Sequence, residues 1–117
     1  MVGAPALGRL ALLAALALSA CAPRATVRPA GNGLVVFAWS GEAEAAWVSG
    51  TMTGWSRVPL VRDGGRLEVA LAVPPGRHEY RLEVLETTGV RTVLPPGVER
   101  AEDGFGGENA VMRVGGR

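Results

Sequence analysis

The chain of 117 residues is poor in the residue types on which many functional sites depend. It has one cysteine and one histidine, and every basic residue is arginine, with no lysine. A lone cysteine cannot close an internal disulfide, and the chain lacks the cysteine and histidine ligands that most metal centres use. The formal net charge of +1 gives no electrostatic case for nucleic acid or an acidic polymer. We therefore expect no metal, no cofactor and no nucleic-acid partner.

Residues 1–20 have the pattern of an export signal peptide. Arg9 precedes an apolar run over residues 10–18, which is shorter than the roughly 20 apolar residues that span a bilayer. The run ends in Leu-Ser-Ala-Cys, which resembles the lipobox of bacterial lipoproteins. This resemblance implies cleavage before Cys21 and lipidation of its thiol, so that the protein is anchored in the cell envelope by lipid. An incidental cysteine in an ordinary signal is the alternative.

The remainder of the chain is long enough for one domain of modest size. Ala22 follows the cysteine, and because it is not aspartate, the resemblance to lipoproteins implies the outer rather than the inner membrane. Residues 21–32 contain two prolines and no apolar periodicity, which predicts a lipidated cysteine and a flexible tether. Residues 33–117 are then expected to form the folded domain.

The pattern from residue 33 onward predicts strands and no long helix. No window keeps helical apolar spacing over ten residues, whereas short apolar runs recur between glycine and proline. These features predict an all-β, immunoglobulin-like antiparallel sandwich of about seven strands. The expected strands lie near residues 34–39, 45–50, 58–61, 66–73, 78–85, 90–94 and 110–114.

Two of these strands are expected to pair with each other as a hairpin. Alternate positions in residues 66–73 and in residues 78–84 carry side chains suited to a buried face. Matching the two faces places Val73 opposite His78, with a Pro-Pro-Gly-Arg loop between them. This register would leave a shallow depression beside Arg81 on the outer face.

Five segments in this order resemble carbohydrate-binding module family 48, which includes the glycogen-binding domain of AMP-activated protein kinase. In one of them, Val-Ser-Gly-Thr-Met-Thr-Gly-Trp stands where the family has a Gly-x-Phe-Asn-x-Trp loop. The resemblance implies a non-catalytic module that binds an α-glucan or a related polysaccharide. The segments are residues 36–41, 48–55, 59–60, 74–81 and 105–111.

The resemblance also implies three sugar-binding residues. Trp55 falls on a tryptophan that stacks on glucose, while Arg81 and Asn109 fall on a lysine and an asparagine that bind hydroxyls. An indole can cover the apolar C–H face of a pyranose, and fixed polar groups can bind its rim of hydroxyls. The loop at residues 86–92 has no aromatic residue in place of the family's second tryptophan. Phe105 is the residue that could supply some of the lost apolar contact.

Each of these residues also has a structural interpretation. Trp55 can fold back as a lid on the core, and Arg81 can pair with a glutamate at position 68, 79 or 83. Asn109 can hydrogen-bond its own backbone in a turn. The other two tryptophans, Trp39 and Trp47, lie in predicted strands, where they are expected to pack in the core or on a sheet face.

The chain offers no recognisable catalytic site. The single histidine, His78, is predicted on an inward face without a nucleophile at a suitable spacing. Its acidic residues lie scattered, whereas glycoside hydrolysis needs two carboxyl groups flanking a cleft. We therefore expect a non-catalytic carbohydrate-binding module of a lipid-anchored envelope protein. The alternative is a protein-interaction or structural envelope module that has lost sugar binding.

Overall fold

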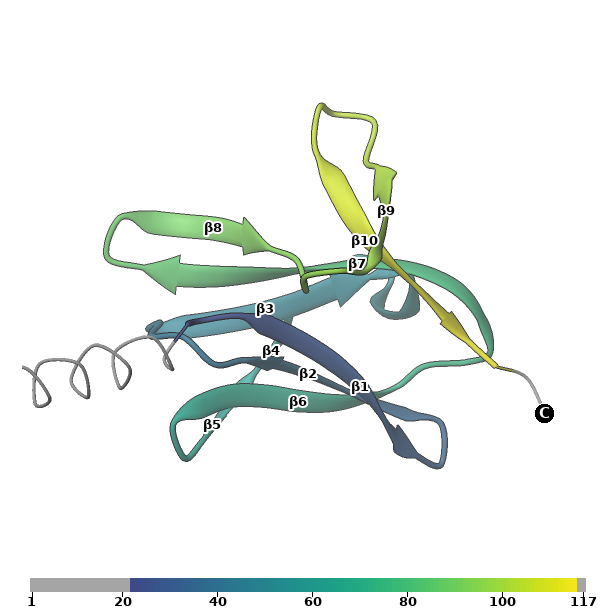
Figure 1. Ribbon diagram of the computed structural model, residues 1–117, viewed down its shortest axis with the longest axis horizontal. Helices are drawn as coiled ribbons and strands as arrows, with labels where there is room; N and C mark the ends of the chain where they lie inside the picture. The colour runs from purple at the N-terminus through teal and green to yellow at the C-terminus, as the bar shows by residue number, and fades with distance from the viewer. Residues whose placement is uncertain (1–21, 116–117) are drawn as a thin grey trace, which may run out of the picture.

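The computed structural model describes residues 22–115 as two antiparallel sheets packed face to face (Figure 1). The first sheet has the order β1-β2-β6-β5, and the second has the order β4-β3-β7-β10-β9, with β8 paired to β7. The predicted all-β sandwich is confirmed. The elements are β1 (Ala25–Gly31), β2 (Leu34–Trp39), β3 (Ala45–Gly50), the 3₁₀ turn η1 (Thr51–Thr53), β4 (Val58–Pro59), β5 (Val61–Asp63), β6 (Arg66–Ala72), β7 (Gly76–Glu86), β8 (Gly89–Val93), β9 (Glu99–Glu102) and β10 (Glu108–Val114).

The predicted export signal and the lipidation site at Cys21 lie outside the described residues. Within residues 22–115, no helix is long and apolar enough to cross a membrane. Among the same residues, no group of three or more histidine, cysteine, aspartate or glutamate side chains is placed to hold a metal ion.

The first strand corrects the prediction of a flexible tether over residues 21–32. Strand β1 pairs with β2 and places Val27 opposite Phe37, so the segment from Ala25 to Gly31 belongs to the sandwich. Its proline, Pro29, is tolerated because β1 is an edge strand whose register shifts at that point. Only Ala25 and Val27 of β1 pack on the core, and the exposed remainder with Pro29 carries no apolar alternation, so the sequence pattern did not reveal the strand.

The single strand expected near residues 58–61 is in fact two short strands in different sheets. Strand β4 pairs with β3, and β5 pairs with β6. Between them, Leu60 is buried and its N–H donates to the Ala46 carbonyl at 2.8 Å. The chain therefore changes sheets at Leu60, and its side chain fills the core at the change.

The predicted hairpin between residues 66–73 and 78–84 does not form. Strand β6 lies in the first sheet and β7 in the second, so the prolines that follow Val73 carry the chain across the sandwich. The assignment of inward faces was largely correct, since Leu67, Val73, Tyr80, Leu82 and Val84 are buried. The two faces meet across the core rather than side by side. The depression predicted beside Arg81 relied on the small Ala70 as its neighbour, and this reason is wrong because the two residues lie on different sheets.

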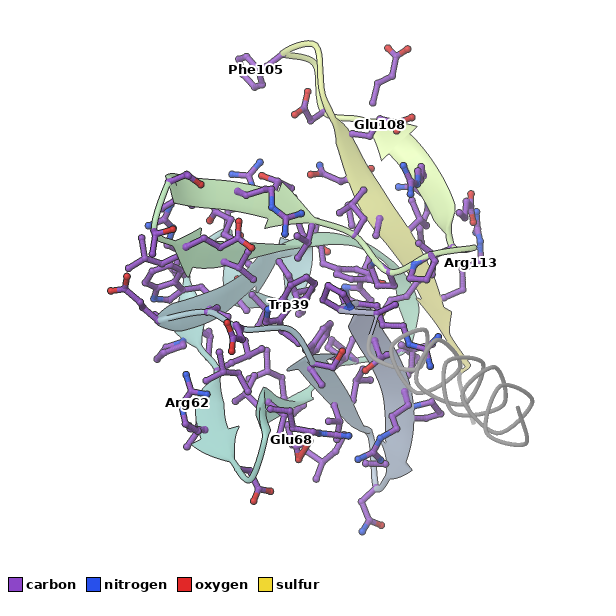
Figure 2. All side chains as sticks on the ribbon, turned by 60° about the vertical axis from the view of Figure 1, so that its left-hand side comes forward. Trp39, Arg62, Glu68, Phe105, Glu108 and Arg113 are labelled. Carbon is purple, nitrogen blue, oxygen red and sulfur yellow. The ribbon has the colours of Figure 1, made fainter. Side chains whose placement is uncertain are left out.

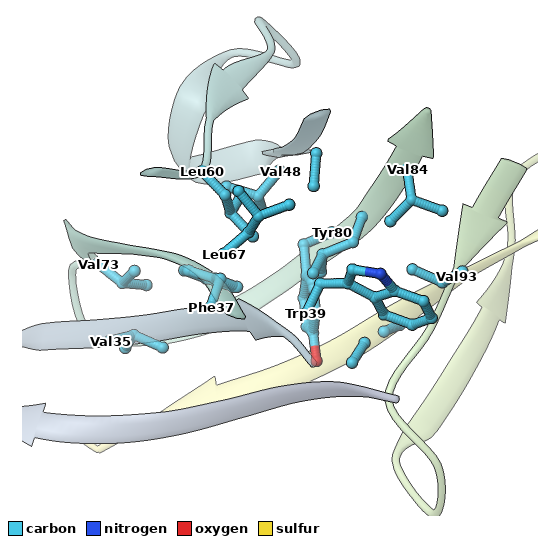
Figure 3. Close-up of a cluster of buried hydrophobic side chains, with 14 residues drawn as sticks. Val35, Phe37, Trp39, Val48, Leu60, Leu67, Val73, Tyr80, Val84 and Val93 are labelled. Carbon is cyan, nitrogen blue, oxygen red and sulfur yellow. The ribbon is translucent and has the colours of Figure 1, made fainter. Parts of the chain in front are cut away.

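The core fills the space between the two sheets (Figure 3). Phe37 and Tyr80 come from opposite sheets and meet edge to face, with ring centroids 5.5 Å apart and planes at 68°. Burial raises the pKa of Tyr80 to about 12. Trp39 packs in the same cluster, as its strand position predicted. This packing fixes which residues of β7 point inward, and hence which point to solvent.

His78 is a packed residue, as predicted from its place on the inward face of β7. Its Nε2 lies 2.8 Å from the Pro74 carbonyl oxygen. Because a carbonyl oxygen can only accept, we assign the hydrogen to Nε2, which donates it. Its Nδ1 then accepts from the Thr51 hydroxyl at 3.1 Å. The imidazole thus ties the start of β7 to the turn that follows β3.

Candidate functional site

Trp55 is presented by a tight turn just after η1. Gly54 and Trp55 both have positive φ, 61° and 65°, and the Ser56 N–H donates to the Thr53 carbonyl at 3.2 Å. This left-handed conformation costs a residue with a side chain roughly 1–2 kcal/mol. The Trp55 side chain is nevertheless 41% exposed, so it is not a lid that folds onto the core. An exposed aromatic ring on a strained turn is a feature typical of a binding site.

Hydrogen bonds inside the turn hold Trp55 in this conformation. The backbone N–H of Trp55 donates to the Gly50 carbonyl at 2.9 Å, and the Thr53 hydroxyl donates to the Ser56 carbonyl at 2.8 Å. Gly50 is required where it stands, because a Cβ there would lie 2.5 Å from the Glu79 carbonyl oxygen. Close packing of the turn on β7 therefore determines where the indole is displayed.

Arg81 projects from the outer face of β7 onto the indole of Trp55. Its guanidinium carbon lies 5.6 Å from the centroid of the Trp55 ring, within the range of a cation–π contact. The ion pair expected for Arg81 does not form, because the glutamates at 68, 79 and 83 pair with Arg66, Arg77 and Arg57. The Arg81 Nε is buried and has no hydrogen-bond partner among residues 22–115.

Asn109 lies beside Arg81 on the same outer face and is only 5% exposed. Its amide nitrogen donates to Oε1 of Glu79 at 3.2 Å, so it does not bond to its own backbone, as one interpretation of the sequence proposed. This hydrogen bond, followed by that from Arg77, lowers the pKa of Glu79 below its ordinary value. The Asn109 Oδ1 is buried without a partner within the described part of the chain.

The loop between β9 and β10 completes the site and projects from the rest of the sandwich (Figure 1). Oδ1 of Asp103 accepts from the backbone N–H groups of Phe105 at 2.7 Å and Gly107 at 3.0 Å. These two bonds lower the pKa of Asp103 below its ordinary value and fix the loop. Phe105 is 94% exposed at the tip, where Figure 2 shows its ring pointing away from the sandwich.

One hollow of about 360 Å³ brings these residues together, and its size is within the range of small-ligand sites. The three residues implied by the resemblance share it with Phe105. Sequence reasoning missed its three carboxylates, although an aspartate followed by glycines is typical of a turn that binds backbone N–H groups. The lining residues are Trp55, Glu79, Arg81, Glu102, Asp103, Phe105 and Asn109.

A larger hollow of about 610 Å³ is lined by residues 42–44, Arg62 and residues 86–88. Two of its polar side chains have partners, since Arg62 donates to the Ala43 carbonyl at 2.8 Å and Glu86 pairs with Arg91 at 2.9 Å. No aromatic residue lines this hollow. The smaller hollow therefore has the aromatic surface on which a sugar ring can stack, and the larger one does not.

Residues 34–115 match the family model described as the glycogen recognition site of AMP-activated protein kinase. The match covers more than half of the chain, so the protein belongs to this family of non-catalytic carbohydrate-binding modules. Among similar proteins are the beta-1 subunits of 5'-AMP-activated protein kinase from Sus scrofa, Rattus norvegicus and Homo sapiens. Each is 35% identical over 49 residues, which are 42% of this chain. The matched part is 40% of the pig chain and 18% of the rat and human chains, well under two thirds of their length.

The left-handed turn at Trp55 makes the glycine and alanine variants differ in stability. Trp55→Gly and Trp55→Ala both remove the ring, but only glycine adopts positive φ without steric cost. We expect Trp55→Gly to be more stable than Trp55→Ala by about 1 kcal/mol. Urea denaturation of the two variants measures the difference, and an alanine variant as stable as the glycine variant would contradict this backbone conformation.

Proposed function

We propose that the hollow binds a neutral α-glucan or a closely related polysaccharide. The observation that carries the proposal is the hollow in which the exposed indole of Trp55 lies beside Arg81 and Asn109, whose Nε and Oδ1 have no partner within residues 22–115. A buried polar group left without a hydrogen bond costs roughly 1–3 kcal/mol. Sugar hydroxyls can act as both donors and acceptors, so they suit the guanidinium of Arg81 and the amide of Asn109, while the indole suits the apolar face of a pyranose.

The charges of the hollow favour a neutral ligand over an anionic one. Three carboxylates, from Glu79, Glu102 and Asp103, line the hollow with one guanidinium, that of Arg81, and Glu79 is paired with Arg77. A uronic acid or a sulfated sugar would bring a further negative charge to a region that is already negative. An uncharged glucan meets no such repulsion.

Two of these carboxylates, Glu79 and Asp103, are held as hydrogen-bond acceptors rather than as catalytic acids. A general acid for glycoside hydrolysis needs a raised pKa, as burial in an apolar pocket provides. Hydrogen bonds instead lower the pKa of Glu79 and of Asp103. Their role is to orient Asn109 and the loop at Phe105, which agrees with a module that binds without catalysis.

Binding to the hollow is tested by calorimetric titration with maltoheptaose and β-cyclodextrin, because Trp55→Gly removes the indole whose fluorescence would otherwise report binding. We expect a saturable change in the wild-type protein and at least tenfold weaker binding in Trp55→Gly, which corresponds to about 1.4 kcal/mol. Val61→Ala is the matched control, because Val61 is an exposed apolar residue on the other sheet.

Two outcomes would contradict the proposal. One is the absence of any saturable change at millimolar sugar, which would favour the alternative of a protein-interaction or structural module. The other is unchanged affinity in Trp55→Gly, which would place the sugar elsewhere on the molecule.

The lipobox-like segment that ends at Cys21 supports a lipid-anchored position in the cell envelope, with Ala22 favouring the outer membrane. Because the sandwich starts at Ala25, the segment between the anchor and the first strand would be about three residues long. Its reach would be roughly 10 Å at 3.3 Å per residue. The polysaccharide would therefore have to lie close to the membrane leaflet that carries the protein.

Lipid anchoring through Cys21 is tested by expressing the full chain with and without Cys21→Ala. We expect the wild-type protein to sediment with membranes and to incorporate labelled fatty acid, because several acyl chains hold a protein on a bilayer. The alanine variant should incorporate none. Labelling that persists in Cys21→Ala would show that the thiol is not the acceptor.

A further inference from the structure

A second stack of arginine on tryptophan lies next to the hollow. The guanidinium carbon of Arg57 is 5.1 Å from the ring centroid of Trp47. Arg57 also donates two hydrogen bonds to Glu83, from Nε to Oε1 at 2.9 Å and from Nη2 to Oε2 at 3.0 Å. The two carboxylate bonds and the indole hold the guanidinium in one orientation.

The register of β3 and β7 places this stack on the same face as the hollow. Ser49 is opposite Arg81, and Trp47 is opposite Glu83. Side chains two residues apart on a strand point to the same face, roughly 6.8 Å from each other. A polysaccharide that passes over Arg81 therefore needs only a few sugar units to reach Glu83 and Trp47.

The Arg57 guanidinium has hydrogen-bonding capacity that the protein does not use. Two of its N–H donors bond to Glu83, and within residues 22–115 no other acceptor bonds to it. A guanidinium has five such donors. Its side chain is 52% exposed, while that of Glu83 is 13% exposed. The free donors of Arg57 are accessible to a ligand on the sheet face, and the carboxylate beneath serves to position them.

We propose that Arg57 is a second polar contact for the same neutral glucan, binding hydroxyls of sugar units beyond those at Trp55. The contact rests on the proposed function, because it extends a chain already bound at the hollow. Trp47 and Glu83 are positioning residues that hold the guanidinium for this purpose. The affinity of the site then depends on the length of the sugar chain, because a short oligosaccharide fills the hollow alone and a longer one also reaches Arg57.

Calorimetric titration of the purified protein with maltotriose and maltoheptaose tests this extension. In Arg57→Gln, we expect the affinity for maltoheptaose to fall about five- to tenfold, as for the loss of one hydrogen bond at an exposed site, and the affinity for maltotriose to be unchanged. Arg57→Lys keeps the charge but not the paired geometry, so its affinity for maltoheptaose should be intermediate. Arg66→Gln is the control, because it removes a similar ion pair, with Glu68, from the other sheet.

Failure of this inference is distinguishable from failure of the proposed function. Equal affinity of wild type and Arg57→Gln for maltoheptaose would overturn the extension and leave the site at Trp55 in place. A parallel loss for both sugars would also overturn it, because that result indicates a general disturbance of the sheet. If the wild-type protein binds neither sugar, the proposed function itself fails and the extension fails with it.

Discussion

The alternation of side chains along β7 is the constraint on which both the core and the site depend. Its inward residues, Tyr80, Leu82 and Val84, are almost completely buried between the two sheets. A shift of one residue would move this whole set to the solvent face, so the core fixes the register. The same register turns Arg81 outward, between the turn of Trp55 and the strand of Asn109. The core thus determines which side chains form the face that carries the candidate site.

Two loops complete that face, and local hydrogen bonds hold both of them. Thr53 and Gly50 fix the turn that displays Trp55, while Asp103 fixes the loop that displays Phe105. A ligand that meets ordered loops does not have to supply the free energy of ordering them. The strained backbone at Trp55 is consistent with this arrangement, since a left-handed tryptophan persists only where its surroundings enforce it.

The sequence was sufficient to predict which face of a strand is buried, but not which strands pair with each other. Alternation identified the buried side of β7, including His78 and Tyr80, because the side-chain period of a strand is a local property. The hairpin with residues 66–73 was wrong because β6 and β7 have compatible apolar faces in two arrangements, side by side or across a core. Strand β1 was missed because only Ala25 and Val27 of it reach the core, and two apolar positions are too short a pattern in a segment containing Pro29.

The residues of the candidate site could also be predicted, but the contacts among them could not. The resemblance named Trp55, Arg81 and Asn109, and the fold brings all three to one hollow. The resemblance gave no indication that Glu79 orients Asn109 or that Arg81 stacks on Trp55, because those contacts join residues far apart in the chain. The stack of Arg57 on Trp47 was also out of reach, since it depends on how β4 lies along β3.

The proposed function requires Trp55, Arg81, Asn109 and Phe105 to act as one preformed sugar site on the outer face of the second sheet. Nuclear magnetic resonance of the labelled protein during titration with maltoheptaose is the decisive test of this requirement. We expect progressive shifts of the Trp55 indole N–H and the Asn109 side-chain amide, with the buried Trp39 indole unchanged. Shifts confined to the first sheet, or a saturating titration that leaves the Asn109 amide unmoved, would contradict it.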